Sequence, residues 1–111
     1  MRDTPFAVIR WAELPPTVSA GETGTVTERV AEVGGFRTRL VEFSSNYRAD
    51  HWCSRGHIVL VLDGSLVTEL ADGRRIETPA GTGFQVGDGG PGHRSSARSG
   101  AKVFIVDQID Q

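Results

Sequence analysis

The sequence predicts an all-β domain. Almost every periodic stretch of this 111-residue chain has the two-residue period of a strand, and turn residues interrupt these stretches at short intervals. Two stretches, 57–62 and 102–107, carry apolar side chains on both faces, so one half-exposed sheet cannot bury them. The architecture that fits is a double-layered sheet whose outer surface has a further cover.

We expect an N-terminal arm over residues 1–24 and a single domain over 25–111. Within the arm, 5–10 is extended, and 11–24, which contains prolines and glycines, has at most one helical turn. Glycine-containing pairs separate the later stretches: Gly34-Gly35, Asp63-Gly64 and Asp72-Gly73. The stretch 25–33 would also suit a short helix, but its neighbours favour a strand. Strands are predicted at 25–33, 36–44, 47–53, 57–63, 65–71, 74–78, 82–86, 93–98 and 101–107.

Composition excludes several classes of partner. The net charge is -2, with 12 basic and 14 acidic residues, and the basic residues are scattered, so no nucleic-acid partner is expected. No apolar run approaches the roughly 20 residues that span a bilayer, and the start lacks a signal-peptide core. We therefore expect a soluble, cytoplasmic protein without membrane contact. A single cysteine makes no internal disulfide, so Cys53 is a packing residue, a reactive thiol or a metal ligand.

The three histidines and the cysteine cluster between positions 51 and 93. In an extended strand residues i and i+2 share a face, so His51 and Cys53 would lie side by side. A short glycine-containing turn then returns His57 to the same volume, and His93 follows a glycine-rich stretch. Imidazole and thiolate both bind transition metals. The alternative is ordinary: a small buried thiol, and polar histidines at strand ends and in a loop.

The chain resembles the cupin superfamily, whose first motif reads Gly-x5-His-x-His-x3 or x4-Glu-x6-Gly. Here His51-x-Cys53-x3-His57-x6-Gly64 has the same spacing from the first histidine onward. Cys53 stands in place of the second histidine and His57 in place of the glutamate, and both replacements are metal ligands. Residues 50–53 also resemble the signature of small bacterial cupins named for an Asp-His-Cys-Trp tetrad, with the last two letters transposed.

Two registers compete for the second cupin motif, Gly-x5-Pro-x-Gly-x2-His-x3-Asn. Gly73-x5-Pro79-x-Gly81 matches its first part, but places Phe84 at the histidine position. The register that begins at Gly81 reaches His93 with one residue inserted, and we prefer it because it supplies a histidine. In that register the closing asparagine is replaced by Ala97.

The resemblance implies a double-stranded β-helix, or jelly-roll barrel, with a metal in its mouth. We assign the metal to His51, Cys53, His57 and His93, a donor set that suits divalent Zn, Fe, Ni or Cu. Four protein ligands would close a tetrahedral zinc site, whereas three histidines without the sulfur would leave open positions for a substrate. Which arrangement holds decides between a structural metal and a reactive one.

We expect the barrel to hold a small-molecule ligand, with a pocket that includes Arg39, Tyr47, Phe84 and Gln85. Arg39 would hold a carboxylate through its guanidinium fork, or pair with a glutamate such as Glu42, Glu69 or Glu77. The predicted function is a metal-binding cupin that binds a small polar or carboxylated molecule, with oxidation or isomerisation as candidate reactions. The alternative is a non-catalytic ligand-binding or sensing module, with a structural metal or none.

We also expect a homodimer, because the outer faces of 57–62 and 102–107 are apolar and require burial. The N-terminal arm, with Trp11 and Leu14, is a second candidate cover for these faces. Whether the arm covers its own barrel or a partner's is left open.

Overall fold

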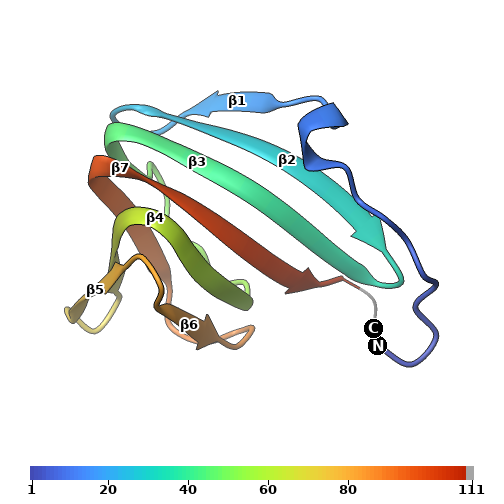
Figure 1. The fold of residues 1–111 in the computed structure, drawn as a ribbon. Helices are drawn as coiled ribbons and strands as arrows, with labels where there is room; N and C mark the ends of the chain where they lie inside the picture. The colour runs from blue at the N-terminus through green and yellow to red at the C-terminus, as the bar shows by residue number, and fades with distance from the viewer. Residues whose placement is uncertain (110–111) are drawn as a thin grey trace.

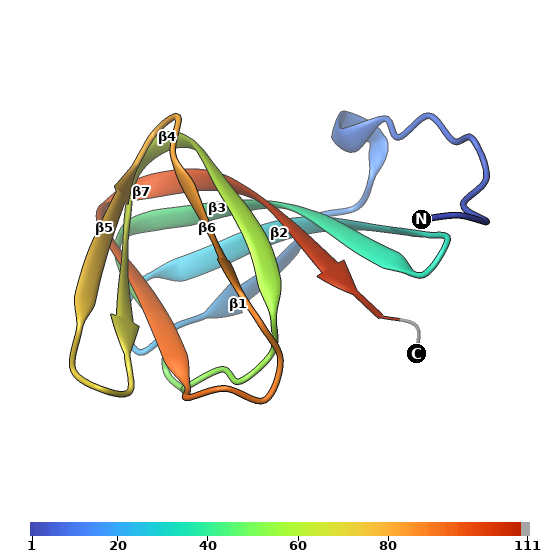
Figure 2. The ribbon, with the colours of Figure 1, turned by 90° about the horizontal axis from the view of Figure 1, so that it is seen from below.

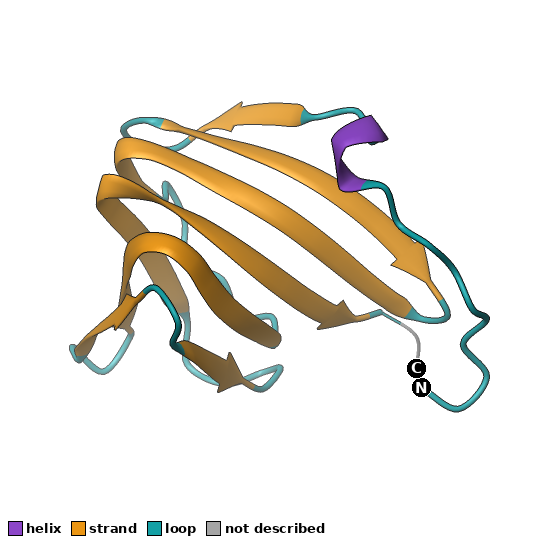
Figure 3. Cartoon of the chain, viewed as in Figure 1, coloured by secondary structure: helices purple, strands orange, loops and turns teal. Residues whose placement is uncertain are grey.

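The structure, a computed structural model, describes residues 1–109 and confirms the predicted all-β class. A single 3-10 turn, η1 (Trp11–Glu13), provides the one helical turn expected in the arm among these residues. No helix in the described range is long and apolar enough to span a membrane. The strands, coloured in Figure 3, are β1 (Thr17–Ala20), β2 (Thr25–Val33), β3 (Phe36–Arg48), β4 (His57–Leu70), β5 (Arg75–Pro79), β6 (Gly83–Val86) and β7 (His93–Gln108).

All strands pair antiparallel in the order β1-β2-β3-β7-β4-β5, and β6 pairs with β4. The sheet curls over itself, so that β1, β2 and β3 lie along one side and β4, β5 and β6 along the other (Figures 1 and 2). The buried core between the two layers is built mostly from β-branched side chains, which suit a pleated surface. Its members are Val41, Val59, Val61, Leu66, Ala97, Ala101, Val103 and Ile105.

The long strands β4 and β7 each continue through a glycine where the sequence suggested an interruption. Asp63-Gly64 was expected to separate two strands, but β4 is continuous and its register with β7 shifts on either side of this pair. Gly64 has φ +76° and Gly100 in β7 has φ +85°, conformations that side chains disfavour. A Cβ on Gly64 would lie 2.4 Å from the carbonyl oxygen of Gly100. The two glycines therefore mark a shared bend that carries both strands from one layer to the other.

The predicted strand at 47–53 is wrong. β3 extends to Arg48, with a positive φ of 59° at Asn46, and the chain then leaves the sheet. Asp50 and His51 form a bend, in which the Asp50 carboxylate contacts the His51 ring, and aspartate favours such turns. His51 and Cys53 therefore do not share a strand face, and the prediction that they lie side by side on one strand is wrong.

The outer face of β4 remains uncovered within the described chain. Its inward residues Val59 and Val61 are buried, as the two-residue period requires. The alternate residues face outward and are about half exposed: Ile58 at 50%, Leu60 at 43% and Leu62 at 45%.

The arm covers the outer face of β7 instead. The Trp11 ring packs edge-on against Phe104, with ring centroids 5.9 Å apart. The Arg29 guanidinium on β2 donates to the carbonyl oxygens of Trp11, Ala12 and Leu14, which fixes the path of the arm. Further along, β1 pairs with β2, so the part of the arm at Thr17–Ala20 belongs to the sheet.

Candidate metal centre

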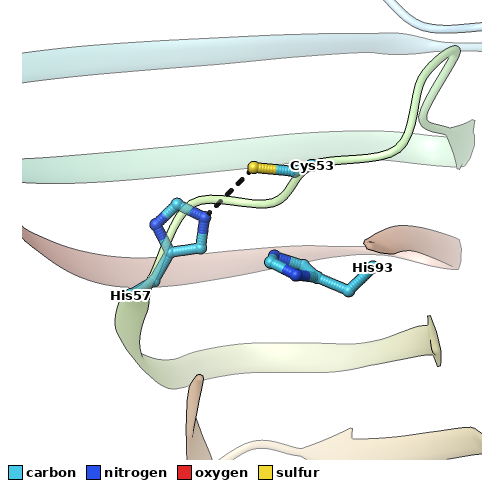
Figure 4. Close-up of side chains that lie close together, drawn as sticks. All are labelled: Cys53, His57 and His93. Carbon is cyan, nitrogen blue, oxygen red and sulfur yellow. Dashed lines mark hydrogen bonds between the residues drawn. The ribbon is translucent and has the colours of Figure 1, made fainter. Parts of the chain in front are cut away.

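Three of the four proposed ligands come together inside the barrel. The potential donor atoms of Cys53, His57 and His93 all lie within 4.8 Å of one another. Cys53 Sγ is 3.6 Å from His57 Nε2, and the two imidazole rings are nearly perpendicular, with centroids 5.4 Å apart (Figure 4). One thiol and two imidazoles thus converge on one point.

Backbone pairing holds this cluster in place. Cys53 lies in the loop between β3 and β4, but it forms an isolated bridge with His93, the first residue of β7. The Cys53 amide donates to the His93 carbonyl at 2.7 Å, and the His93 amide donates to the Cys53 carbonyl at 2.8 Å. His57 is the first residue of β4 and pairs with Val86 of β6. Two strand starts and one bridged loop residue therefore position the three donors.

The loop 49–56 is tied to the loop 87–92, which precedes β7. The Gly56 amide donates to the Asp88 carboxylate at 2.6 Å, and the Gly89 amide donates to the Ser54 carbonyl at 3.0 Å. A chain segment without regular structure is usually mobile unless such bonds satisfy its backbone. These contacts explain how a loop can hold Cys53 against the start of a strand.

The electrostatics of the cluster favour a neutral His93. This residue is 5% exposed, and burial, followed by the nearby His57, lowers the pKa of His93 below its ordinary value of 6.5. A neutral imidazole is the form that binds metals. His93 Nδ1 is buried and has no hydrogen-bond partner among the described residues. A buried polar atom without a partner is costly, so this atom is available to bind a further group.

The spacing of the donors fits a transition metal. Zinc–sulfur and zinc–nitrogen bonds of about 2.3 and 2.05 Å at a tetrahedral angle place the two ligand atoms about 3.6 Å apart. Cys53 Sγ and His57 Nε2 are 3.6 Å apart. The other donor pairs of the set are at most 4.8 Å apart. Sulfur and imidazole nitrogen also exclude magnesium and calcium, which prefer oxygen.

The fourth predicted ligand, His51, lies apart from this set. Its side chain is 78% exposed, and its Nδ1 is 2.6 Å from Asp50 Oδ1. The hydrogen bond with His51 is the largest cause that lowers the pKa of Asp50, so this contact favours the carboxylate form. His51 still lines the cavity beside the cluster, but from its exposed side.

A cavity of about 250 Å³ adjoins the three donors. Of the four predicted pocket residues, Arg39, Tyr47 and Phe84 line it. Gln85 does not, because it alternates with Phe84 along β6 and lies in a separate depression beside Ile58. Burial, and then the negative charges of Asp50 and Glu28, raise the pKa of Tyr47, so its hydroxyl stays protonated near neutral pH.

Arg39 is already paired with two carboxylates, Glu28 and Asp107, and neither is among the partners expected from the sequence. Its Nη1 is 3.4 Å from Glu28 Oε2, its Nε is 3.0 Å from Asp107 Oδ2, and its Nη2 donates to Asp107 Oδ1 at 3.3 Å. Asp107 also contacts His57 Nδ1 through Oδ1, at 2.5 Å. The sequence did contain a signal for Asp107, because it follows Val103 and Ile105 on the inward face of one strand. A carboxylate at such a position is either paired or functional.

Comparisons with known proteins show the fold. Neither a scan of family models nor a search of curated proteins gave a match. Among solved structures, an RmlC-like cupin from Shewanella frigidimarina matches with a TM-score of 0.73 and 12% identity, over 97% of this chain and 95% of that one. Ectoine synthase from P. lautus matches with a TM-score of 0.73 and 19% identity, over 93% and 78%.

A third match is a structure of Fe(II)-HppE with an alternative substrate, with a TM-score of 0.75 and 13% identity. It covers 92% of this chain and 60% of that one. Identities this low establish shared architecture and leave activity open. The two-layered antiparallel sheet and these neighbours together show that the chain has the all-β jelly-roll fold of the cupins.

Proposed function

We propose that the protein is a small metal-binding cupin in which Cys53, His57 and His93 hold a divalent transition metal, Zn, Fe, Ni or Cu. The observation that carries this proposal is the convergence of three nitrogen and sulfur donors beside a cavity. The buried, unpartnered Nδ1 of His93 supports it independently. A structural neighbour solved with Fe(II) and a substrate gives further support, because 92% of this chain matches part of its architecture.

Three protein donors leave a coordination position for a ligand from the cavity. A metal bound there would supply a Lewis acid that polarises the ligand or lowers the pKa of a bound water. His51, the fourth candidate, lies outside the proposed set. It remains close enough to line the same cavity, where it would face an incoming ligand.

The residues of the chain define what the cavity accepts. Val59, Phe43 and Phe84 give it an apolar wall, and the protonated Tyr47 hydroxyl offers a donor. Arg39 is not free to anchor a carboxylate, since Glu28 and Asp107 already neutralise it. The ligand we propose is therefore a small polar molecule whose own oxygen or nitrogen faces the metal, with oxidation or isomerisation as the candidate reactions.

Metal analysis of protein purified without added metal tests the proposal. His57→Ala is expected to reduce occupancy strongly, whereas the matched change His51→Ala leaves it close to wild type. Metal that binds only the native state adds about 2.7 kcal/mol to the free energy of unfolding when its concentration is 100 times its Kd. Removing the metal with EDTA should therefore lower the melting temperature of wild type and of His51→Ala, but not that of His57→Ala. Equal occupancy in all three proteins would contradict the proposed site.

Cobalt substitution separates an enzyme from a sensing or structural module. A thiolate-to-cobalt charge-transfer band is expected, because Cys53 is in the set. A spectrum that changes when azide or small acids are added indicates an open position and supports a reactive metal. An unresponsive tetrahedral spectrum favours the non-catalytic alternative, in which the metal is structural.

We also propose that the chain forms a homodimer through the outer face of β4. The support is the row of half-exposed Ile58, Leu60 and Leu62, which the arm leaves uncovered because it packs on β7 instead. Contiguous apolar residues of this kind are typical of association surfaces.

A further inference from the structure

A row of charged and polar side chains crosses the sheet behind the proposed metal site. It consists of Glu28 on β2, Arg39 on β3, Asp107 on β7 and His57 on β4, one from each of four neighbouring strands. Each member contacts the next: Glu28 with Arg39 at 3.4 Å, Arg39 with Asp107 at 3.0 Å, and Asp107 with His57 at 2.5 Å. The row starts on β2, one strand from the edge of the sheet, and ends on a proposed metal ligand.

The centre of this row is the best-buried carboxylate of the site. The Asp107 side chain is 6% exposed, and those of His57 and Arg39 are 11% and 20% exposed. Burying an ionised carboxylate costs several kcal/mol unless it is paired and hydrogen-bonded. Asp107 has a charged partner and a hydrogen-bond partner. The Arg39 guanidinium contacts both of its oxygens, and the His57 ring contacts Oδ1.

We infer that Asp107 is the positioning residue that fixes the tautomer and orientation of His57. A carboxylate only accepts hydrogen bonds, so His57 Nδ1 must carry the proton of the 2.5 Å contact. In the neutral ring the lone pair is then on Nε2, the atom that faces Cys53 Sγ. Arg39 holds the carboxylate in this orientation, and Glu28 holds Arg39.

This inference deepens the proposed function, because its consequence for metal binding depends on that site. Partners that hold a ligating histidine through its second nitrogen typically contribute 10–100-fold to metal affinity. Asp107→Asn keeps the shape of the side chain, but its amide nitrogen can donate to Nδ1 and stabilise the opposite tautomer. Nε2 then carries the proton and no longer offers a lone pair to the cavity.

The tautomer can be measured directly, without metal. Long-range nitrogen–proton NMR spectra of metal-free protein labelled with ¹⁵N-histidine, recorded at several pH values, distinguish a ring protonated on Nδ1, on Nε2 or on both nitrogens. We expect His57 to carry its proton on Nδ1 in wild type and on Nε2, or on both in exchange, in Asp107→Asn. Asp63→Asn, at an exposed carboxylate elsewhere on β4, is the matched control and should resemble wild type.

Cobalt titration of the same proteins gives the second readout, with a 10–100-fold loss of affinity expected for Asp107→Asn and none for Asp63→Asn. The wild-type spectrum alone suffices if Asp107→Asn does not fold, because an Nε2-protonated His57 in wild type overturns the inference. An unchanged, singly populated tautomer in folded Asp107→Ala, which offers Nδ1 no acceptor at this position, also overturns it. If wild type shows the expected tautomer but binds no cobalt, the proposed metal site fails while the role of Asp107 in orienting His57 stands.

Discussion

The bend that β4 and β7 share predicts an unusually sensitive position at Gly64. Its φ of +76° lies in the left-handed region, where an alanine costs roughly 1–2 kcal/mol. A Cβ there would also lie 2.4 Å from the Gly100 carbonyl oxygen, a backbone atom that cannot rotate away. Forcing an extra methyl group into packed surroundings adds about 1–3 kcal/mol.

Gly81 provides the matched control. Its φ is +86°, but a Cβ at this position would meet no atom within 4 Å. Gly81→Ala therefore measures the backbone strain alone, whereas Gly64→Ala measures strain together with the steric clash. The second variant should be less stable than the first by about 1–3 kcal/mol.

Urea denaturation followed by circular dichroism and tryptophan fluorescence checks this difference. With a denaturant slope of about 1–3 kcal/mol per molar for a small domain, the two midpoints should differ by on the order of 1 M. Equal destabilisation by both variants would refute the reasoning, because it would mean that β4 and β7 do not approach each other at this glycine pair.

The remaining predictions concern the surface and the arm. Leu60→Glu is expected to give a monomer when its mass is measured by light scattering coupled to size exclusion. Val18→Glu, at an exposed valine of β1, should leave the proposed dimer intact. A dimer in both variants would show that the interface does not include Leu60. The pKa of Glu69 lies below its ordinary value of 4.5, mainly because Arg94 Nε donates to the Glu69 carboxylate at 3.0 Å. The contribution of this pair to folding stability is therefore present above pH 4.5 and is lost as the pH falls through the lowered pKa. Arg94→Ala should consequently flatten the loss of stability under acid conditions, measured by urea titration at several pH values, and an unchanged profile would argue against the pair. Trp11→Ala should lower the free energy of unfolding by about 1 kcal/mol through loss of its aromatic contact, and no change in the urea midpoint would show that the arm contributes nothing to stability.

The two-residue period was sufficient to predict the fold class, because it reflects burial of one face of each strand. At 25–33 the pattern also suited a helix, and the neighbouring strands correctly decided for a strand. It could not distinguish the bend at Gly64 from a hairpin turn, since both require a glycine with positive φ. Only the presence of Gly100 opposite it, 36 positions away, makes it a bend.

The site was predictable in its residue types but not in its geometry. Cys53 pairs with His93 through an isolated backbone bridge between a loop and the start of β7, a long-range contact that no local pattern contains. For Arg39 the sequence left open a ligand or a glutamate as its partner. The actual partners, Glu28 and Asp107, are 11 and 68 positions away, and only the order of the strands brings them together.

The position of β7 in the sheet has a consequence for synthesis of the protein. This strand is the last of the described chain, yet it lies between β3 and β4 and pairs with both. A nascent chain that has not yet released β7 therefore exposes two long, unpaired edges, which are hazards for aggregation. The barrel can close only after β7 has been translated, so a product truncated before His93 would lack the centre of the fold rather than its margin.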